Sequence, residues 1–147
     1  QLFNKTNQMN LATRRMTESE IVEWTNSRNR VLWTYCVSDK FGDSGLTGIA
    51  CLEFQGNNAL ATDYILSCRV MGKCIEETII HQITEYARAS GAKILIANYQ
   101  PTGKNTPCLE FWQRSGFFDE GDHTYSWDLA KSYPCPDAID LTVKQDS

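Results

Sequence analysis

The stretch LATDYILSCRVMGKCIEETIIHQITEYARASGAKILIANY, residues 60–99, predicts a strand, a turn, a helix and a second strand in succession. Isoleucines recur at helical spacing from about Lys73 until Gly91, where the glycine ends the helix as a C-terminal cap. One strand is expected at 60–68, and the other, at 93–99, is apolar enough to predict burial on both faces. This unit forms the centre of the predicted fold.

Two further strands are predicted before this unit. Residues 31–37 are apolar, aromatic and β-branched, and turn formers at 39–45 separate them from a second apolar run at 46–54. Gly56 and Asn57 then suit a tight antiparallel turn into the strand quoted above. The three strands therefore predict a meander.

A helix-start signature lies near the N-terminus. Residues 11–16 predict a short strand, after which Thr17 is the expected N-cap. Glu20 follows three residues later and completes a capping box. The helix is predicted to run to about Asn26.

A second helix and another strand follow the central unit. Thr106 as N-cap and Pro107 in the first helical position predict a helix to about Ser115. The next predicted strand, at 123–129, carries alternating side chains on one face: His123, Tyr125, Trp127 and Leu129. The last residues are predicted to be a tail, which gives one domain at 1–130 and a tail at 131–147.

Composition narrows the class of protein. The 147 residues, 41% hydrophobic and 22% charged, describe one globular domain, and a net charge of -4 argues against nucleic-acid binding. No apolar run reaches the ~20 residues of a membrane span. Six cysteines without metal-ligand spacing predict reduced thiols, a cytoplasmic location and no metal site. The chain opens on Gln1 rather than Met, which favours a piece of a longer protein.

The turn before the central helix carries the clearest chemical signal. Arg69, Gly72 and Cys74 form an R-x-x-G-x-C pattern where a strand passes into a helix. Helix N-termini bind anions through backbone N–H groups, and arginine and lysine add charge suited to a pyrophosphate. The candidate phosphate-binding residues are Cys68, Arg69, Val70, Met71, Gly72, Lys73 and Cys74.

A second motif, NTPCLEFWQRSGF at 105–117, follows one helix and one strand later. Together with the order of elements, the two motifs resemble those of the GNAT acyltransferases. The matching residues are Arg69, Gly72, Asn105, Phe111, Gly116 and Phe117, while Cys74 and Cys108 replace small residues. The resemblance implies an α+β GNAT fold, with a mixed, mostly antiparallel sheet flanked by helices, and a coenzyme A pyrophosphate on the first motif.

A closer resemblance covers almost the whole chain. Its motifs are KTNQMNLATRRM at 5–16, FGDSGLTG at 41–48, LSCRVMGK at 66–73 and PTGKN at 101–105. They are similar to the C-terminal GNAT-like domain of FkbH-type proteins. That resemblance implies an N-terminal haloacid-dehalogenase-like (HAD-like) partner domain, which loads a glyceryl unit onto an acyl carrier protein.

Several residues are candidates for proton transfer. The family often uses the tyrosine of the second motif as general acid, and Trp112 stands there instead. This leaves two options: an acid from elsewhere, such as Tyr99 or Tyr125, or no acetyl transfer at all. Glu76 is expected on the buried face of the central helix, either as a base or as a cap of its own helix. The remaining base candidates are Asp63, which alternation groups with Ala61 and Ile65, and His123.

Other polar and nucleophilic residues complete the candidate site. Asn105 is expected to be free to meet a ligand, and Lys104 is expected to form a basic patch with Arg69 and Lys73, unless it is an ordinary surface lysine. Trp112 is also a candidate cofactor-binding residue, because it stands at the tyrosine position of the second motif. Cys74 and Cys108 each lie in a first helical turn, where the helix dipole can lower a thiol pKa, so a covalent acyl-cysteine mechanism is one hypothesis. The alternative is that each cysteine simply replaces a small residue.

Three functions remain open at this level. The first is an acyltransferase-like domain that binds coenzyme A or the phosphopantetheine arm of an acyl carrier protein. The second is a catalytically silent module that docks the carrier protein. The third is a small-molecule N-acetyltransferase, because nothing in the sequence determines the acceptor.

Overall fold

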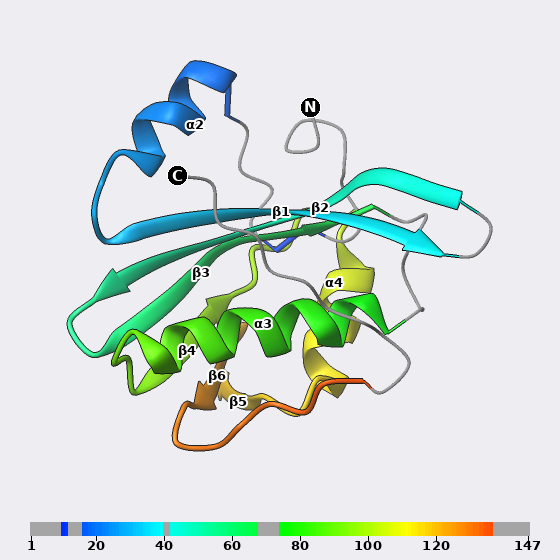
Figure 1. Ribbon diagram of the computed structural model, residues 1–147. Helices are drawn as coiled ribbons and strands as arrows, with labels where there is room; N and C mark the ends of the chain where they lie inside the picture. The colour runs from blue at the N-terminus through cyan, green and yellow to red at the C-terminus, as the bar shows by residue number, and fades with distance from the viewer. Residues whose placement is uncertain (1–9, 12–15, 40–41, 68–73, 137–147) are drawn as a thin grey trace.

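The computed structural model describes residues 10–11, 16–39, 42–67 and 74–136 (Figure 1). Within them lies a six-stranded sheet with the order β1-β2-β3-β4-β6-β5, in which β3 and β4 run parallel and all other neighbours antiparallel. The strands are β1 (Arg30–Asp39), β2 (Gly42–Gln55), β3 (Asn58–Leu66), β4 (Ile94–Asn98), β5 (Phe118–Gly121) and β6 (Thr124–Asp128). The helices are α2 (Glu18–Thr25), α3 (Ile75–Ala89) and α4 (Thr106–Arg114). The mixed, mostly antiparallel sheet predicted from the sequence is confirmed.

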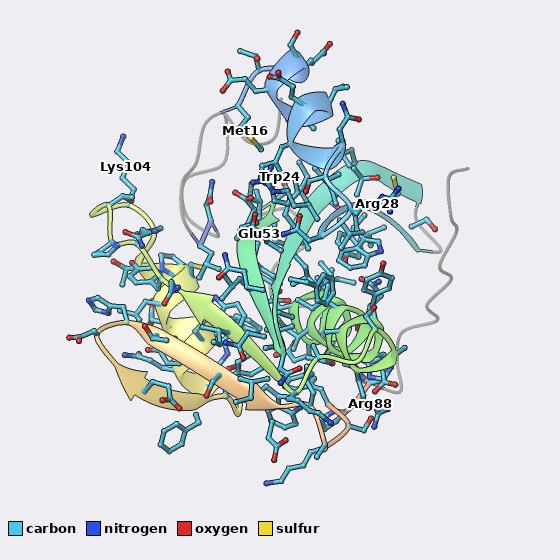
Figure 2. The ribbon with its side chains drawn as sticks, turned by 90° about the vertical axis from the view of Figure 1, so that its left-hand side faces the viewer. Met16, Trp24, Arg28, Glu53, Arg88 and Lys104 are labelled. Atoms are coloured by element: carbon cyan, nitrogen blue, oxygen red, sulfur yellow. The ribbon has the colours of Figure 1, made fainter. Side chains whose placement is uncertain are left out.

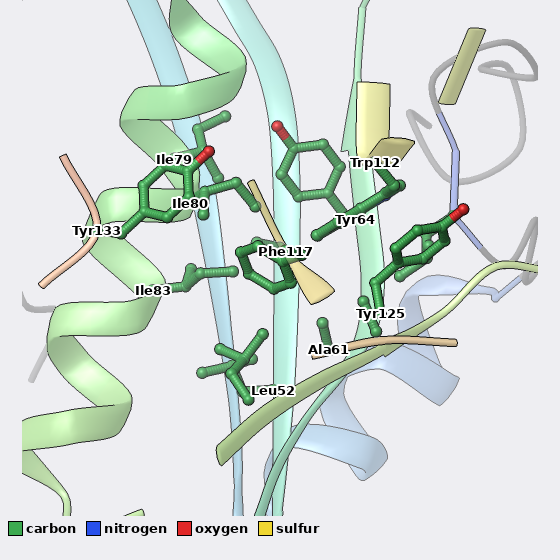
Figure 3. Close-up of a cluster of buried hydrophobic side chains, with 14 of the residues drawn as sticks. Leu52, Ala61, Tyr64, Ile79, Ile80, Ile83, Trp112, Phe117, Tyr125 and Tyr133 are labelled. Carbon is green, nitrogen blue, oxygen red and sulfur yellow. The ribbon is translucent and has the colours of Figure 1, made fainter. Parts of the chain in front are cut away.

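The helices cover the two faces of the sheet separately. On one face, Ile21 and Trp24 of α2 pack on a small cluster that contains Met16, Cys51 and Ile65 (Figure 2). On the other face, α3 and α4 share the main hydrophobic cluster (Figure 3). Residues of opposite faces therefore belong to different chemical environments.

The start of α2 matches the predicted capping box. Glu20 N donates to Thr17 Oγ1 at 3.2 Å, and Thr17 N donates to Glu20 Oε1 at 3.3 Å. Two otherwise unpaired donors of the first turn are satisfied in this way. The helix ends at Thr25, with Asn26 as its C-cap.

The chain after β6 packs onto α3 and α4. Tyr133 is buried in the main cluster, and its hydroxyl donates to the Ser115 carbonyl at 2.5 Å. His81 Nδ1 lies 2.6 Å from the Tyr133 carbonyl oxygen. These contacts hold residues 131–133 against the rest of the fold.

Two predictions about strands are wrong, and one strand was not predicted. The segment predicted as a loop at 39–45 is mostly strand, because β2 begins at Gly42, which pairs with Asp39. β4 is buried on one face only, since Leu95 and Ala97 are buried while Ile94 is exposed. β5 was not predicted, because all four of its residues are exposed and show no alternating pattern.

A bulge at Thr62 decides which way the middle of β3 faces. Cys51 pairs with Asp63 and Leu52 pairs with Ala61, so Thr62 is an extra residue in β3. Ala61 belongs to the main cluster, while Asp63 lies in register with Cys51 of the small cluster. The predicted grouping of Asp63 with Ala61 is therefore wrong, and Asp63 faces the α2 side.

Candidate functional site

The parallel strands β3 and β4 separate at their carboxyl ends. They pair only between Asn58–Ala61 and Ile94–Ala97, after which β3 continues to Leu66 and β4 ends at Asn98. We call this divergence beyond Ala61 and Ala97 the fork. Crevices at the carboxyl ends of parallel strands are common ligand sites, and α3 and α4 both follow strands that end here.

Residues 10–11 of the chain lie in the fork. Leu11 N donates to the Tyr64 carbonyl at 3.0 Å, and Gln100 N donates to the Leu11 carbonyl at 2.9 Å. Asn10 forms an antiparallel bridge with Ile65. Both Asn10 and Leu11 are 0% exposed, so this short segment, blue in Figure 1, is fully enclosed between the two strands.

Asn105 is the centre of a hydrogen-bond network beside the fork. Its Oδ1 accepts from Tyr99 Oη at 2.7 Å and from Thr102 N at 3.0 Å. Its Nδ2 donates to the carbonyls of Asn10, at 3.0 Å, and Gln100, at 2.7 Å. The side chain is 0% exposed and its hydrogen-bonding groups are all used, which differs from the expected side chain free to meet a ligand. Asn105, not Thr106, is also the N-cap position of α4.

Two of the proposed proton carriers are placed unfavourably. The Tyr99 hydroxyl is committed to Asn105, and burial raises the pKa of Tyr99 above its usual value. His123 is exposed and has φ +61°, so it belongs to the β5–β6 turn and not to the face of Tyr125 as predicted. The His123 ring lies edge-on to Tyr99, with centroids 5.5 Å apart. Burial also raises the pKa of Tyr125.

Trp112 is a core residue in this structure. It is completely buried among the rings of Tyr64, Phe111, Phe117 and Tyr125 (Figure 3). Its indole nitrogen makes no hydrogen bond of good geometry within the part of the chain described here. An indole N–H does not act as an acid at neutral pH, so Trp112 contributes packing and shape.

Glu76 and Arg114 meet between α3 and α4. Glu76 is buried, as the helical pattern predicts, and its Oε2 lies 3.8 Å from Nη2 of the exposed Arg114. The Glu76 carbonyl accepts from the Tyr64 hydroxyl at 2.9 Å. Asp63 lies on the opposite face of the sheet, so the two carboxylates proposed as bases do not share a site.

Cys108 is unsuited to nucleophilic catalysis. Burial raises the pKa of its thiol to about 12, and this outweighs the smaller lowering effects of the Trp112 and Asn10 N–H groups. Almost none of this thiol is ionised near neutral pH. Small-residue replacement in a packed helix explains Cys108 better than a covalent mechanism.

Thiol reactivity tests this assignment. At pH 8 we expect a thiol reagent to modify Cys74, which is exposed, and not Cys108 until the protein unfolds. Cys74→Ser should therefore remove one equivalent of thiol from the fast phase of the reaction with the reagent, whereas Cys108→Ser should leave that phase unchanged. Loss of a fast equivalent in Cys108→Ser would contradict the burial argument.

Cys74 has an unusual backbone conformation at the start of α3. Its φ of 65° and ψ of 10° are left-handed, a region that suits glycine. The Cys74 side chain makes no capping hydrogen bond to the helix. Glu76 and Glu77 place negative charge in the first turn of α3, where the positive end of the helix dipole favours it.

Replacing Cys74 with glycine should stabilise the protein by about 0.5–1 kcal/mol. Relief of the left-handed strain gains about 1–2 kcal/mol, and the extra freedom of the unfolded chain offsets part of it. Urea denaturation would measure the difference, with Cys74→Ala as the matched control that keeps a Cβ. Equal stabilities of the two variants would contradict a strained backbone at this position.

The remaining predicted binding residues are only partly placed. The phosphate-loop residues from Cys68 to Lys73 lie outside the described residues. Lys104 is exposed and points outward from the loop before α4 (Figure 2). Sequence reasoning missed Asn10, Leu11 and Arg114, although all three lie within quoted motifs, at 5–16 and 105–117.

Two classes of feature are not found among the described residues. No group of three or more His, Cys, Asp or Glu side chains there could hold a metal ion. No helix in those ranges is long and apolar enough to cross a membrane.

Comparison with known proteins establishes the fold. The chain matches no family model and no curated protein. It is similar to the PaiA N-acetyltransferase from Thermoplasma acidophilum in complex with coenzyme A, at 18% identity and a TM-score of 0.57, over 75% of this chain and 67% of that one. It is also similar to a GNAT-family acetyltransferase from Staphylococcus aureus, at 13% identity and a TM-score of 0.57, over 76% and 75%. An IAA acetyltransferase from Bacillus cereus gives 13% identity and a TM-score of 0.54, over 76% and 85%. These similarities show the GNAT fold.

Proposed function

We propose that this domain binds a phosphopantetheine thioester, carried by coenzyme A or by an acyl carrier protein, and takes part in acyl transfer. The observation that carries the proposal is the fork between β3 and β4, where the Tyr64 carbonyl of β3 and the Gln100 N–H beyond β4 both bond to the backbone of Leu11. A pantetheine arm offers the same kinds of group, since it carries secondary amides. A solved structure of the same fold, at 18% identity, holds coenzyme A.

The residues around the fork fit the two ends of such a ligand. The start of α3, without a side-chain cap from Cys74, suits a phosphate through its dipole. The phosphate-loop residues Arg69 and Lys73 would add charge there. The arm itself would use the Tyr64 carbonyl and the Gln100 N–H, both of which already serve an amide-bearing chain.

Acyl transfer at this site would depend on positioning more than on acid catalysis. A thiolate is a stable leaving group near neutral pH, so transfer does not require a general acid. The tryptophan at position 112, where GNAT acyltransferases often have an acidic tyrosine, therefore does not prevent transfer. Glu76 is the carboxylate placed on the same face as the fork's Tyr64, and it would accept the proton of an attacking group. The bound thioester would supply the activated acyl group.

The carrier-protein arm is the donor that we favour. The motifs similar to FkbH-type C-terminal domains support a carrier protein and a HAD-like partner domain, with glyceryl or acyl transfer as their shared task. The exposed Lys104 suits an acidic carrier surface. The described cysteines are all free thiols, which fits a cytoplasmic location.

A silent docking module is the second candidate, and one group of contacts favours it. Trp112 replaces the acid, and the polar groups of Tyr99 and Asn105 are consumed by structural hydrogen bonds. Such a domain would bind the carrier arm without transferring its acyl group. The small-molecule N-acetyltransferase is not favoured by any described contact.

Calorimetric titration separates these functions. We expect micromolar binding of coenzyme A or of a phosphopantetheinylated carrier protein, and at least a tenfold loss in Gly72→Glu, which places bulk and negative charge in the phosphate loop. Asn57→Glu is the control, because it adds the same side chain at the exposed β2–β3 turn, at the opposite end of β3, without the positive φ of the neighbouring Gly56.

The result has three clear outcomes. Binding that survives Gly72→Glu unchanged would overturn the phosphate-loop assignment. Binding of the carrier protein together with a transfer rate that falls in Glu76→Gln would support an enzyme. Binding without any transfer would identify the docking module.

A further inference from the structure

We infer that residues Asn10 and Leu11 form an internal strap that occupies the place of the ligand arm and must leave the fork before the arm can bind. The inference rests on the proposed function for the identity of the ligand. The occupancy of the fork by the strap is a feature of this structure in its own right. The domain is therefore closed by its own chain.

The strap bonds to both sides of the fork through its backbone. Leu11 N reaches the Tyr64 carbonyl on the β3 side, and Leu11 O accepts from Gln100 N just beyond β4, at 3.0 and 2.9 Å. Tyr64 lies beyond the last residue of β3 that pairs with β4, and Gln100 follows the end of β4, so neither group takes part in the parallel pairing. A buried strand edge requires such partners, and the strap supplies them.

The strap and a pantetheine arm would compete for the same atoms. Both present amide N–H and carbonyl groups. Once the Tyr64 carbonyl and the Gln100 N–H are bonded to Leu11, an arm in the fork would have to displace those bonds. Because the strap is completely enclosed, the two occupants exclude each other by volume as well.

Asn105 acts as the latch of the strap. Its Nδ2 donates to the Asn10 carbonyl, and its Oδ1 is oriented by the hydroxyl of Tyr99 and the N–H of Thr102. Asn105 also occupies the N-cap position of α4, so the latch is fixed to the start of that helix. A side chain that the family resemblance assigns to the ligand site is used here to hold the strap.

Native-state hydrogen exchange tests whether the strap opens. We expect the amides of Leu11 and Gln100 to exchange by local opening, at least tenfold faster than the amide of Ala50 within the β2–β3 ladder. Exchange of all three amides at one rate, through global unfolding, would make residues 10–11 a fixed part of the fold and overturn the inference.

Ligand binding tests whether the strap competes. Leu11→Ala weakens the strap by removing a buried side chain, and Leu52→Ala is the matched control, because it removes an equally buried leucine of the same cluster from β2. We expect coenzyme A to bind Leu11→Ala at least tenfold more tightly than the unaltered protein, and Leu52→Ala to show no gain.

The outcomes distinguish the strap from the proposed function. Equal binding to all three proteins would overturn the strap and leave the proposed function intact. Binding to Leu11→Ala alone would support both. Absence of binding to any of the three, with the carrier protein tested as well, would contradict the proposed function and remove the competition that the inference requires.

Discussion

Replacing Asn105 by alanine should lower the free energy of unfolding by about 3–5 kcal/mol. The change removes the side-chain donor to the buried Asn10 carbonyl and to the Gln100 carbonyl, and the side-chain acceptor of the Thr102 N–H, while the Tyr99 hydroxyl keeps its bond to the Asn105 backbone carbonyl at 3.0 Å. Each such group costs about 1–3 kcal/mol when water cannot reach it, and partial relaxation reduces their sum. Urea denaturation followed by circular dichroism would measure the loss.

Asn98→Ala provides the control for this prediction. Asn98 also accepts a side-chain hydrogen bond, from Thr124 Oγ1 at 2.8 Å, but it is exposed at the end of β4. Water can replace that bond, so we expect a change within about 0.5 kcal/mol. Similar losses in the two variants would show that the buried network around Asn105 is not a major source of stability.

Trp112→Ala should be comparably destabilising, by about 3–5 kcal/mol. The indole is completely enclosed by aromatic rings, with centroids 5.0 Å from Phe117 and 5.5 Å from Tyr64. Its removal leaves a cavity that rings of adjacent elements cannot fill without moving. The midpoint and slope of chemical denaturation would show the loss.

The controls for Trp112 address its size and its chemistry separately. Phe118→Ala removes an aromatic ring that is 66% exposed on β5, and we expect a change within about 0.5 kcal/mol. Trp112→Tyr keeps an aromatic ring and introduces the hydroxyl of the family's acid. A Trp112→Ala protein as stable as the unaltered one would contradict the core assignment.

The local parts of this fold were predictable from the sequence. The capping box at Thr17 and Glu20 depends on residues three apart, and the meander and α3 depend on periodic patterns within single segments. Even the burial of Glu76 follows from helical spacing alone. Signals of this kind are contained in one element and do not require the rest of the chain.

The parts that failed depend on contacts between distant segments. Asn105 was expected to be open, because its partner Asn10 lies at the other end of the chain. Alternation misplaced Asp63, since one extra residue in β3 cannot be seen without its pairing partner in β2. The turn conformation of His123 requires a hairpin with β5, whose exposed residues carry no apolar pattern.

The extra residue at Thr62 also affects how this chain should be compared with its relatives. Ahead of the bulge, odd-numbered residues of β3 such as Ala61 face α3, and beyond it even-numbered residues such as Tyr64 do so. A relative that lacks this residue will align correctly by letter on one half of the strand only. Loss of this one residue would leave Asp63 facing the α2 side and Tyr64 facing α3, because the bulge absorbs the extra residue. The faces are kept while the sequence register shifts by one, so a carboxylate equivalent to Asp63 in space need not be its neighbour in an alignment without gaps.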